Sequence, residues 1–130
     1  MDNEQKDTRI FTKRHLWADC DPNSRVAYIG ITDFLVEKLS EIRSIDMPEP
    51  ADEIDADTIF VHLYLVNRVH HLRAPLTGRI LEINQEVLDN PSLLHLDPNK
   101  YWLLTMEYDS DEEVDLQMDK QRYDDYVNKL

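Results

Sequence analysis

The segment spanning residues 59–66 constrains the fold more than any other part of the chain. Its sequence, IFVHLYLV, alternates along a strand, so that the odd-numbered residues can be buried while His62 and Tyr64 lie on the opposite face. Residues 67 and 68, Asn and Arg, interrupt the pattern, and Asn tolerates the positive φ of a tight turn. We therefore predict a two-residue turn there and a returning strand over residues 69–73.

Shorter elements flank this hairpin and are separated by Pro, Asn and Asp residues, which break regular structure. Alternating segments predict strands over residues 11–17, 25–31, 41–47, 79–83 and 101–108. Helical turns are expected after Thr32, within residues 86–96, and at the C-terminus, where Tyr123, Tyr126, Val127 and Leu130 recur at helical spacing. These elements indicate a mainly β protein with short helices at its margins.

The domain organisation follows from where this patterning begins. Residues 1–9 are polar and have no apolar residues to bury apart from Met1, so we expect a disordered lead-in. Residues 10–130 then form a single domain, which suits the length of the chain.

The composition excludes several classes of function. The chain carries 14 Lys and Arg against 27 Asp and Glu, a net charge of −13 that repels nucleic acids and anionic lipids. Gly30 and Gly78 are its only glycines and stand far apart, so there is no glycine-rich phosphate loop. The single Cys20 favours a reducing, cytoplasmic compartment. Because nucleophile motifs, export signals and membrane-length apolar runs are also missing, we expect neither an enzyme nor a membrane protein.

Two histidines of the hairpin are weak candidates for a metal site. With a turn at residues 67 and 68, His71 would oppose Tyr64 and lie diagonally from His62, within about 7–8 Å between Cα atoms. His70 would point to the other face. Catalytic zinc normally has three protein ligands, and no nearby Asp, Glu or Cys completes the set, so we predict no metal.

The charge of the chain is unevenly distributed. Residues 58–81 contain no Asp or Glu, whereas Arg68, His70, His71, Arg73 and Arg79 fall together there. Either a half-buried hairpin simply excludes carboxylates, or this is a docking patch for an acidic partner. Residues 107–119, by contrast, hold seven carboxylates and no base, which is typical of a solvated linker.

Four motifs occur in an order that resembles a known family. They are FTKRHLW at residues 11–17, IGITDF at residues 29–34, MPEPADE at residues 47–53 and APLTG at residues 74–78. From about residue 11 to the C-terminus, the chain resembles the glycine cleavage system H-protein family of lipoyl carriers. The resemblance implies a flattened barrel-sandwich hybrid, like other lipoyl and biotinyl carriers, with short peripheral helices and a C-terminal helix.

The resemblance also implies an exposed hairpin tip that carries a lipoylated lysine, in a sequence close to ESVKA, at a fixed distance before the APLTG-like motif. Counting back from Ala74 without a gap, that lysine position is Asn67. Tyr64 occupies the position of the family's Glu before the lysine, and His71 occupies the position of its acidic residue after the lysine. No lysine lies between Lys38 and Lys100. Because neither a carboxamide nor a guanidinium can replace the acceptor amine, we expect no lipoate cofactor.

Three functions are compatible with this sequence. The chain can be a lipoate-free relative of the H-protein that binds an aminomethyltransferase-like enzyme, a lipoate-handling enzyme or a second copy of itself. The residues proposed for partner binding are Tyr64, Arg68, His70, His71 and Arg73. It can instead be a small module whose hairpin tip binds a metal or an anion. Finally, it can be a carrier modified at an unusual lysine, of which Lys38 and Lys100 are the nearest in sequence.

Overall fold

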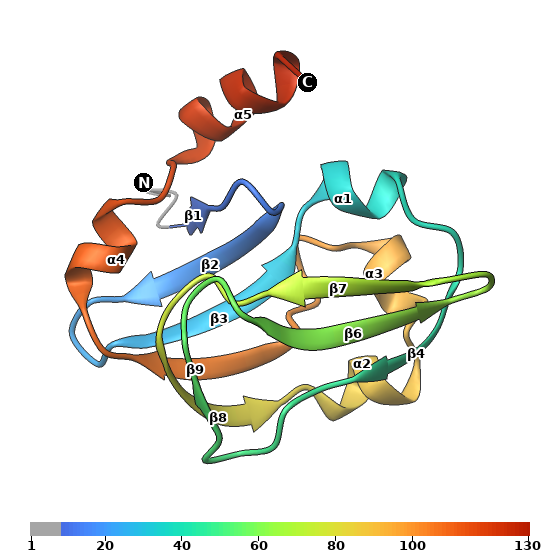
Figure 1. Cartoon of the computed structure of the whole chain (residues 1–130), viewed down its shortest axis with the longest axis horizontal. Helices are drawn as coiled ribbons and strands as arrows, with labels where there is room; N and C mark the ends of the chain where they lie inside the picture. Colours follow the sequence, from blue (N-terminus) through green and yellow to red (C-terminus); the bar gives the residue numbers. More distant parts are fainter. Residues whose placement is uncertain (1–8) are drawn as a thin grey trace, which may run out of the picture.

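A computed structural model of the chain describes residues 9–130 and contains two β-sheets (Figure 1). The six-stranded sheet has the order β1 (Arg9–Phe11), β2 (Leu16–Asp21), β3 (Val26–Ile31), β9 (Leu104–Tyr108), β8 (Gly78–Ile83) and β5 (Glu53–Ile54). The three-stranded sheet has the order β4 (Ile42–Asp46), β6 (Ile59–Leu65) and β7 (Val69–Arg73). Five helices complete the described chain: α1 (Asp33–Glu37), α2 (Gln85–Asp89), α3 (Leu93–Leu96), α4 (Asp111–Asp115) and α5 (Lys120–Asn128).

The main core lies between the two sheets. Leu16 and Ile29 of the six-stranded sheet share one buried cluster with Leu63 and Leu72 of the three-stranded sheet, and each is at most 1% exposed. This arrangement confirms the mainly β fold with short helices and a C-terminal helix. Within residues 9–130 no strand is hydrogen-bonded into both sheets, so the sheets do not close into a continuous barrel.

The C-terminal helix α5 covers the other face of β1 and β2. Its Tyr123 is buried with Phe11 and Trp17 in a second cluster, and the rings of Phe11 and Tyr123 stack at 4.9 Å. Trp17 faces Gly30 in the register of β2 and β3, and its indole N–H donates to the Pro98 carbonyl at 3.1 Å. The predicted amphipathic helix is therefore present, because its tyrosines have an apolar surface to cover.

The predicted strand over residues 11–17 is wrong in one respect. The chain forms β1, reverses direction, and continues as β2, which pairs antiparallel with β1. The Thr12 carbonyl accepts from His15 N–H at 3.0 Å, and His15 has a φ of 71°. Residues 11–17 read as one alternating strand because Phe11 and Trp17, which belong to two different strands, are buried in the same cluster.

The predicted alternation of β6 fails at its first residues. A bulge interrupts the pairing with β7 between Ile59 and Val61, so that Phe60 is buried and Ile59 is 44% exposed. From Val61 onward the predicted faces are correct, with Val61, Leu63 and Leu65 buried. A bulge adds one residue to one strand and so reverses the faces on one side of it.

The acidic segment over residues 107–119 is ordered structure rather than a solvated linker. Ser110 caps helix α4, whose Glu113 carboxylate accepts from the backbone N–H of Thr77 at 2.7 Å and from its hydroxyl at 2.8 Å. Arg25 contacts Asp111 at 3.3 Å and Arg79 contacts Glu107 at 3.0 Å. Contacts to other segments therefore offset the mutual repulsion of these carboxylates.

The predicted lead-in falls almost entirely outside the described residues, which begin with Arg9, the first residue of β1. Within residues 9–130, no helix has the length and apolarity needed to cross a membrane.

Candidate functional site

The tip of the β6–β7 hairpin projects from one end of the molecule, away from helix α4 (Figure 1). The Leu65 N–H donates to the Arg68 carbonyl at 2.8 Å, which leaves Val66 and Asn67 as the two-residue loop. Tyr64 pairs with Val69 below it. The loop therefore lies one residue earlier than predicted, and the register of the two strands differs from the prediction by two residues.

The tip exposes apolar surface beside one arginine. Tyr64 is 40% exposed, Val66 57% and Val69 38%, which is unusual for large apolar residues so close together. Asn67 and Arg68 are also exposed, and within residues 9–130 the Arg68 guanidinium has no carboxylate within ion-pair distance. Such a patch can bind another protein through apolar contacts and one free positive charge.

The shifted register makes His62 and His71 direct neighbours rather than diagonal ones. Their Nδ1 atoms lie 2.8 Å apart, so that one ring donates a hydrogen bond to the other, and the ring planes are nearly perpendicular at 88°. No group of three His, Cys, Asp or Glu residues in the described part of the chain is placed to hold a metal ion. The pair alone therefore supplies two ligands at most.

His70 lies on the opposite face of β7 and is half-buried. Burial, followed by the positive charge of Arg68 and the proximity of His71, lowers the pKa of His70. It therefore carries little charge at neutral pH. Of the residues proposed for partner binding, Arg68 carries a permanent positive charge, whereas His70 can contact a partner mainly through its uncharged ring.

Arg73 does not belong to the tip. It ends β7, five residues beyond Arg68, which places it about 17 Å away along an extended strand. Its guanidinium donates to the Asp57 carbonyl at 2.7 Å, at the base of the hairpin. The structure therefore brings Tyr64, Arg68, His70 and His71 into the outer part of the hairpin and separates Arg73 from them.

Cys20 offers no nucleophile. It is buried in the main core, and burial together with the nearby Asp19 raises the pKa of its thiol to about 12. Thiolates are the reactive form of cysteine, so this residue is inert at neutral pH.

A two-sheet fold with a projecting hairpin is the fold of a family of carrier proteins. A family model described as glycine cleavage H-protein matches residues 9–130, and the chain belongs to that family. Members of the family are carriers rather than catalysts, and they work with partner enzymes of the glycine cleavage system.

Individual relatives agree with this assignment. The chain is 33% identical over 115 residues to the glycine cleavage system H protein of Carboxydothermus hydrogenoformans, covering 88% of this chain and 87% of the relative. It is 31% identical over 126 residues to glycine cleavage system H protein 4 of Aquifex aeolicus, covering 96% and 72%. A crystal structure of the H protein from Mycobacterium marinum has the same fold, with a TM-score of 0.80 at 24% identity, covering 96% and 99%.

The residues at the tip do not fit a lipoyl group. The loop presents Asn67 and the valine before it, and neither has an amine that could form the amide to lipoate. The described lysines lie elsewhere: Lys13 in the turn after β1, Lys38 at the end of α1, Lys100 before β9, and Lys120 and Lys129 at the ends of α5. Attachment to this hairpin would need a different residue from any that it contains.

Proposed function

We propose that this chain is a lipoate-free member of the H-protein family that binds a protein partner through the tip of the β6–β7 hairpin. One observation carries the proposal. The tip keeps the projecting hairpin of a carrier but presents Tyr64, Val66 and Val69 around Arg68, with no lysine. Asn67 is our assignment for the family's lysine position, from the ungapped spacing to Ala74.

The partner should present an acidic surface next to an apolar one. Arg68 carries a free positive charge on a hairpin without carboxylates, whereas the chain as a whole has a net charge of −13. Opposite charges at an interface raise the association rate and fix the orientation of binding. An aminomethyltransferase-like enzyme, a lipoate-handling enzyme and a second copy of this chain are the candidates.

The absence of the lipoyl group is tested by mass spectrometry. The chain is co-expressed with a lipoate ligase, together with a lysine-bearing H-protein that reports on ligase activity in the same cells. We expect the control to gain a lipoyl group and this chain to keep its unmodified mass. A lipoyl-sized increase would overturn the proposal, and peptide mapping would then identify the modified lysine, with Lys38 and Lys100 as the first candidates.

Partner binding is tested with a charge reversal at the tip. Arg68→Glu should weaken binding to the cognate aminomethyltransferase or lipoate-handling enzyme, or weaken self-association in sedimentation experiments, and the loss should shrink at high salt. Arg122→Glu is the matched control, because Arg122 is an exposed arginine of α5 and lies outside the three-stranded sheet. Arg73→Glu reports on the base of the hairpin. Equal effects of all three changes would show that the tip has no special role.

A further inference from the structure

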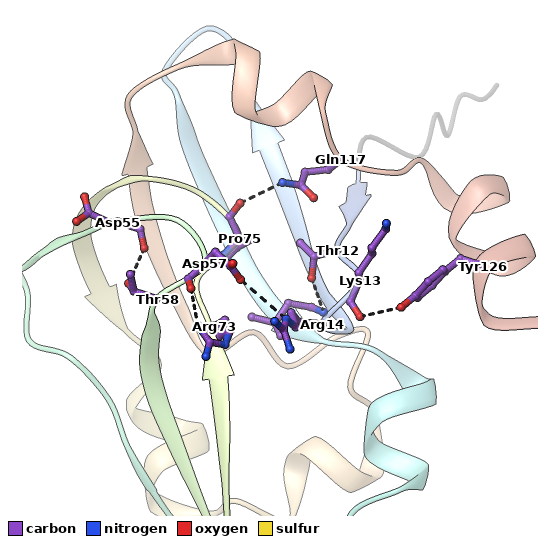
Figure 2. Close-up of polar contacts among 11 residues, drawn as sticks. Thr12, Lys13, Arg14, Asp55, Asp57, Thr58, Arg73, Pro75, Gln117 and Tyr126 are labelled. Atoms are coloured by element: carbon purple, nitrogen blue, oxygen red, sulfur yellow. Dashed lines mark hydrogen bonds and ion pairs between the residues drawn. The ribbon is translucent and has the colours of Figure 1, made fainter. Parts of the chain in front are cut away.

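A recess at the base of the hairpin has no role in the proposed function. It has a volume of about 370 Å³ and lies where four loops meet (Figure 2). These are the turn after β1, the loop before β6, the residues at and after the end of β7, and the segment between α4 and α5. Segments that are more than 100 residues apart in sequence thus share one cavity, as residues 12–14 and 116–118 do.

Backbone hydrogen bonds hold the walls in place. Phe11 and Met118 exchange N–H to carbonyl bonds at 2.8 and 3.0 Å, and Asp57 N–H donates to the Ala74 carbonyl at 2.8 Å. The Gln117 side chain donates to the Pro75 carbonyl at 3.4 Å, which connects these two pairs of walls to each other (Figure 2). The recess is therefore largely formed before any ligand arrives, which lowers the cost of binding.

The recess is positively charged, whereas the chain as a whole is negatively charged. Lys13, Arg14 and Arg73 line it, and among the lining residues within the described range 9–130 Asp57 is the one carboxylate. Arg14 approaches that carboxylate only to 3.9 Å, with both side chains more than half exposed. Arg73 donates to the backbone carbonyl of Asp57, which carries no net charge, so its own charge is not neutralised. Counted over the described lining residues, three positive charges against one negative leave a surplus of two, whereas the chain has a net charge of −13.

The remaining wall of the recess is apolar. Ala74, Pro75 and Met118 contribute to it, and Leu116 at its rim is 82% exposed, the largest exposure among the large apolar residues of the described chain. A bare inorganic anion would use the arginines and leave this wall in contact with water. A molecule that joins an anionic group to a short hydrocarbon chain would use both.

We propose that this recess binds a small organic carboxylate with a short apolar chain. The carboxylate is held by Arg14 and Arg73, which can each donate two parallel hydrogen bonds to it, with Lys13 adding a third positive charge. The hydrocarbon chain lies against Leu116, Pro75 and Met118. Asp57 opposes binding, since its carboxylate repels the ligand and competes for Arg14.

The experiment uses the full chain and sodium hexanoate as the probe, with binding followed by calorimetry and by backbone amide shifts. We expect saturable binding, with shifts in residues 12–14, 56–57, 73–75 and 116–118. Arg73→Gln and Arg14→Gln should each weaken binding about tenfold, the usual effect of losing one charge-assisted contact. Arg43→Gln, an exposed arginine outside the recess, should leave binding unchanged. Because Arg14 is exposed, its substitution tests the site even if Arg73→Gln perturbs folding.

One variant should improve binding, which a purely structural effect would not do. Asp57 has a φ of 62°, and Asn tolerates this conformation as well as Asp does, so Asp57→Asn keeps the loop and removes the opposing charge. We expect hexanoate to bind about fivefold tighter to this variant. Binding that is unchanged in Arg14→Gln and Asp57→Asn overturns the proposal. If 1-hexanol binds as tightly as hexanoate, the site does not recognise the carboxylate and the proposal is wrong. If acetate or inorganic phosphate binds as tightly as hexanoate, the site does not recognise the hydrocarbon chain and the proposal is also wrong.

Discussion

His62 and His71 face each other directly across β6 and β7, with their Nδ1 atoms 2.8 Å apart. Each ring satisfies one nitrogen of the other, on a strand face that is otherwise open to water. The contact gives each histidine a hydrogen-bond partner on this face, through the two Nδ1 atoms.

We expect Zn²⁺ to leave the melting temperature of the chain unchanged. Two imidazoles fall short of the three protein ligands of a catalytic zinc site, and a ligand that binds only weakly to the folded state stabilises it little. Thermal unfolding after EDTA treatment, with and without added zinc, measures this. A zinc-dependent rise that disappears in both His62→Ala and His71→Ala would instead support the metal-binding module.

Gly78→Ala should destabilise the fold more than Gly30→Ala. A Cβ on Gly78 would lie 2.1 Å from the Glu107 backbone carbonyl oxygen, and one on Gly30 would lie 2.3 Å from the Trp17 ring. A side chain can shift more easily than a strand paired on both sides, so we expect a loss of about 2 kcal/mol at Gly30 and a larger loss at Gly78. Urea unfolding measures both, with the exposed Ser40→Ala as the control. The reverse order would contradict the argument.

Glu113→Ala should cost about 1.5 kcal/mol of unfolding free energy, whereas Glu112→Ala one residue earlier should change it by at most about 0.5 kcal/mol. Only Glu113 accepts hydrogen bonds from Thr77, through which α4 is attached to the loop before β8. Chemical denaturation of the two variants provides the comparison. Equal effects would mean that the acidic segment contributes only through its overall charge.

The stability of the chain should fall in mildly acidic solution because of His15. Its Nδ1 lies 2.8 Å from the Tyr123 hydroxyl, and burial, followed by His70 and Lys38, lowers its pKa from the ordinary 6.5. The unfolded chain therefore binds this proton more readily than the folded chain does. The contribution of His15 is fully present above pH 6.5 and is lost as the pH falls toward the lowered folded-state pKa.

The matching measurement is the free energy of unfolding at pH 7.5 and at pH 5 in the wild type and in His15→Gln. We expect the wild type to lose more stability between these two values than the variant, which cannot take up the proton. His70→Gln should also lose less unfolding free energy than the wild type between these two pH values, because burial also lowers the pKa of His70. Parallel pH profiles for wild type and both variants would rule out this linkage.

The two glycines are required by close packing rather than by turns. Gly30 lies within β3, Gly78 begins β8, and neither has a positive φ. What each position requires is space: Trp17 packs over the one and β9 runs against the other. A close approach between distant segments cannot be read from local sequence, whereas a turn often can.

The register of the hairpin shows the same limit. The predicted and observed pairings differ by two residues, and a slip of two leaves every side chain on its own face, since strands alternate with a period of two. Hydrophobic patterning therefore predicted that Leu63 would be buried and His62 would not, but it could not distinguish the two registers. The turn geometry decided between them, by leaving Val66 and Asn67 in the loop and so pairing His62 with His71.

The sequence by itself determined the family, most strands and helices, and the absence of lysine between Lys38 and Lys100, because these depend on residue types and on spacing along the chain. Only the tertiary structure decided that Arg73 lies at the base of the hairpin rather than at its tip, and that it lines a recess with Lys13 and Arg14. It also decided that α4 is attached to Thr77 through Glu113. Each of these depends on which loops meet in space, and those contacts are set by the packing of two sheets rather than by any one segment.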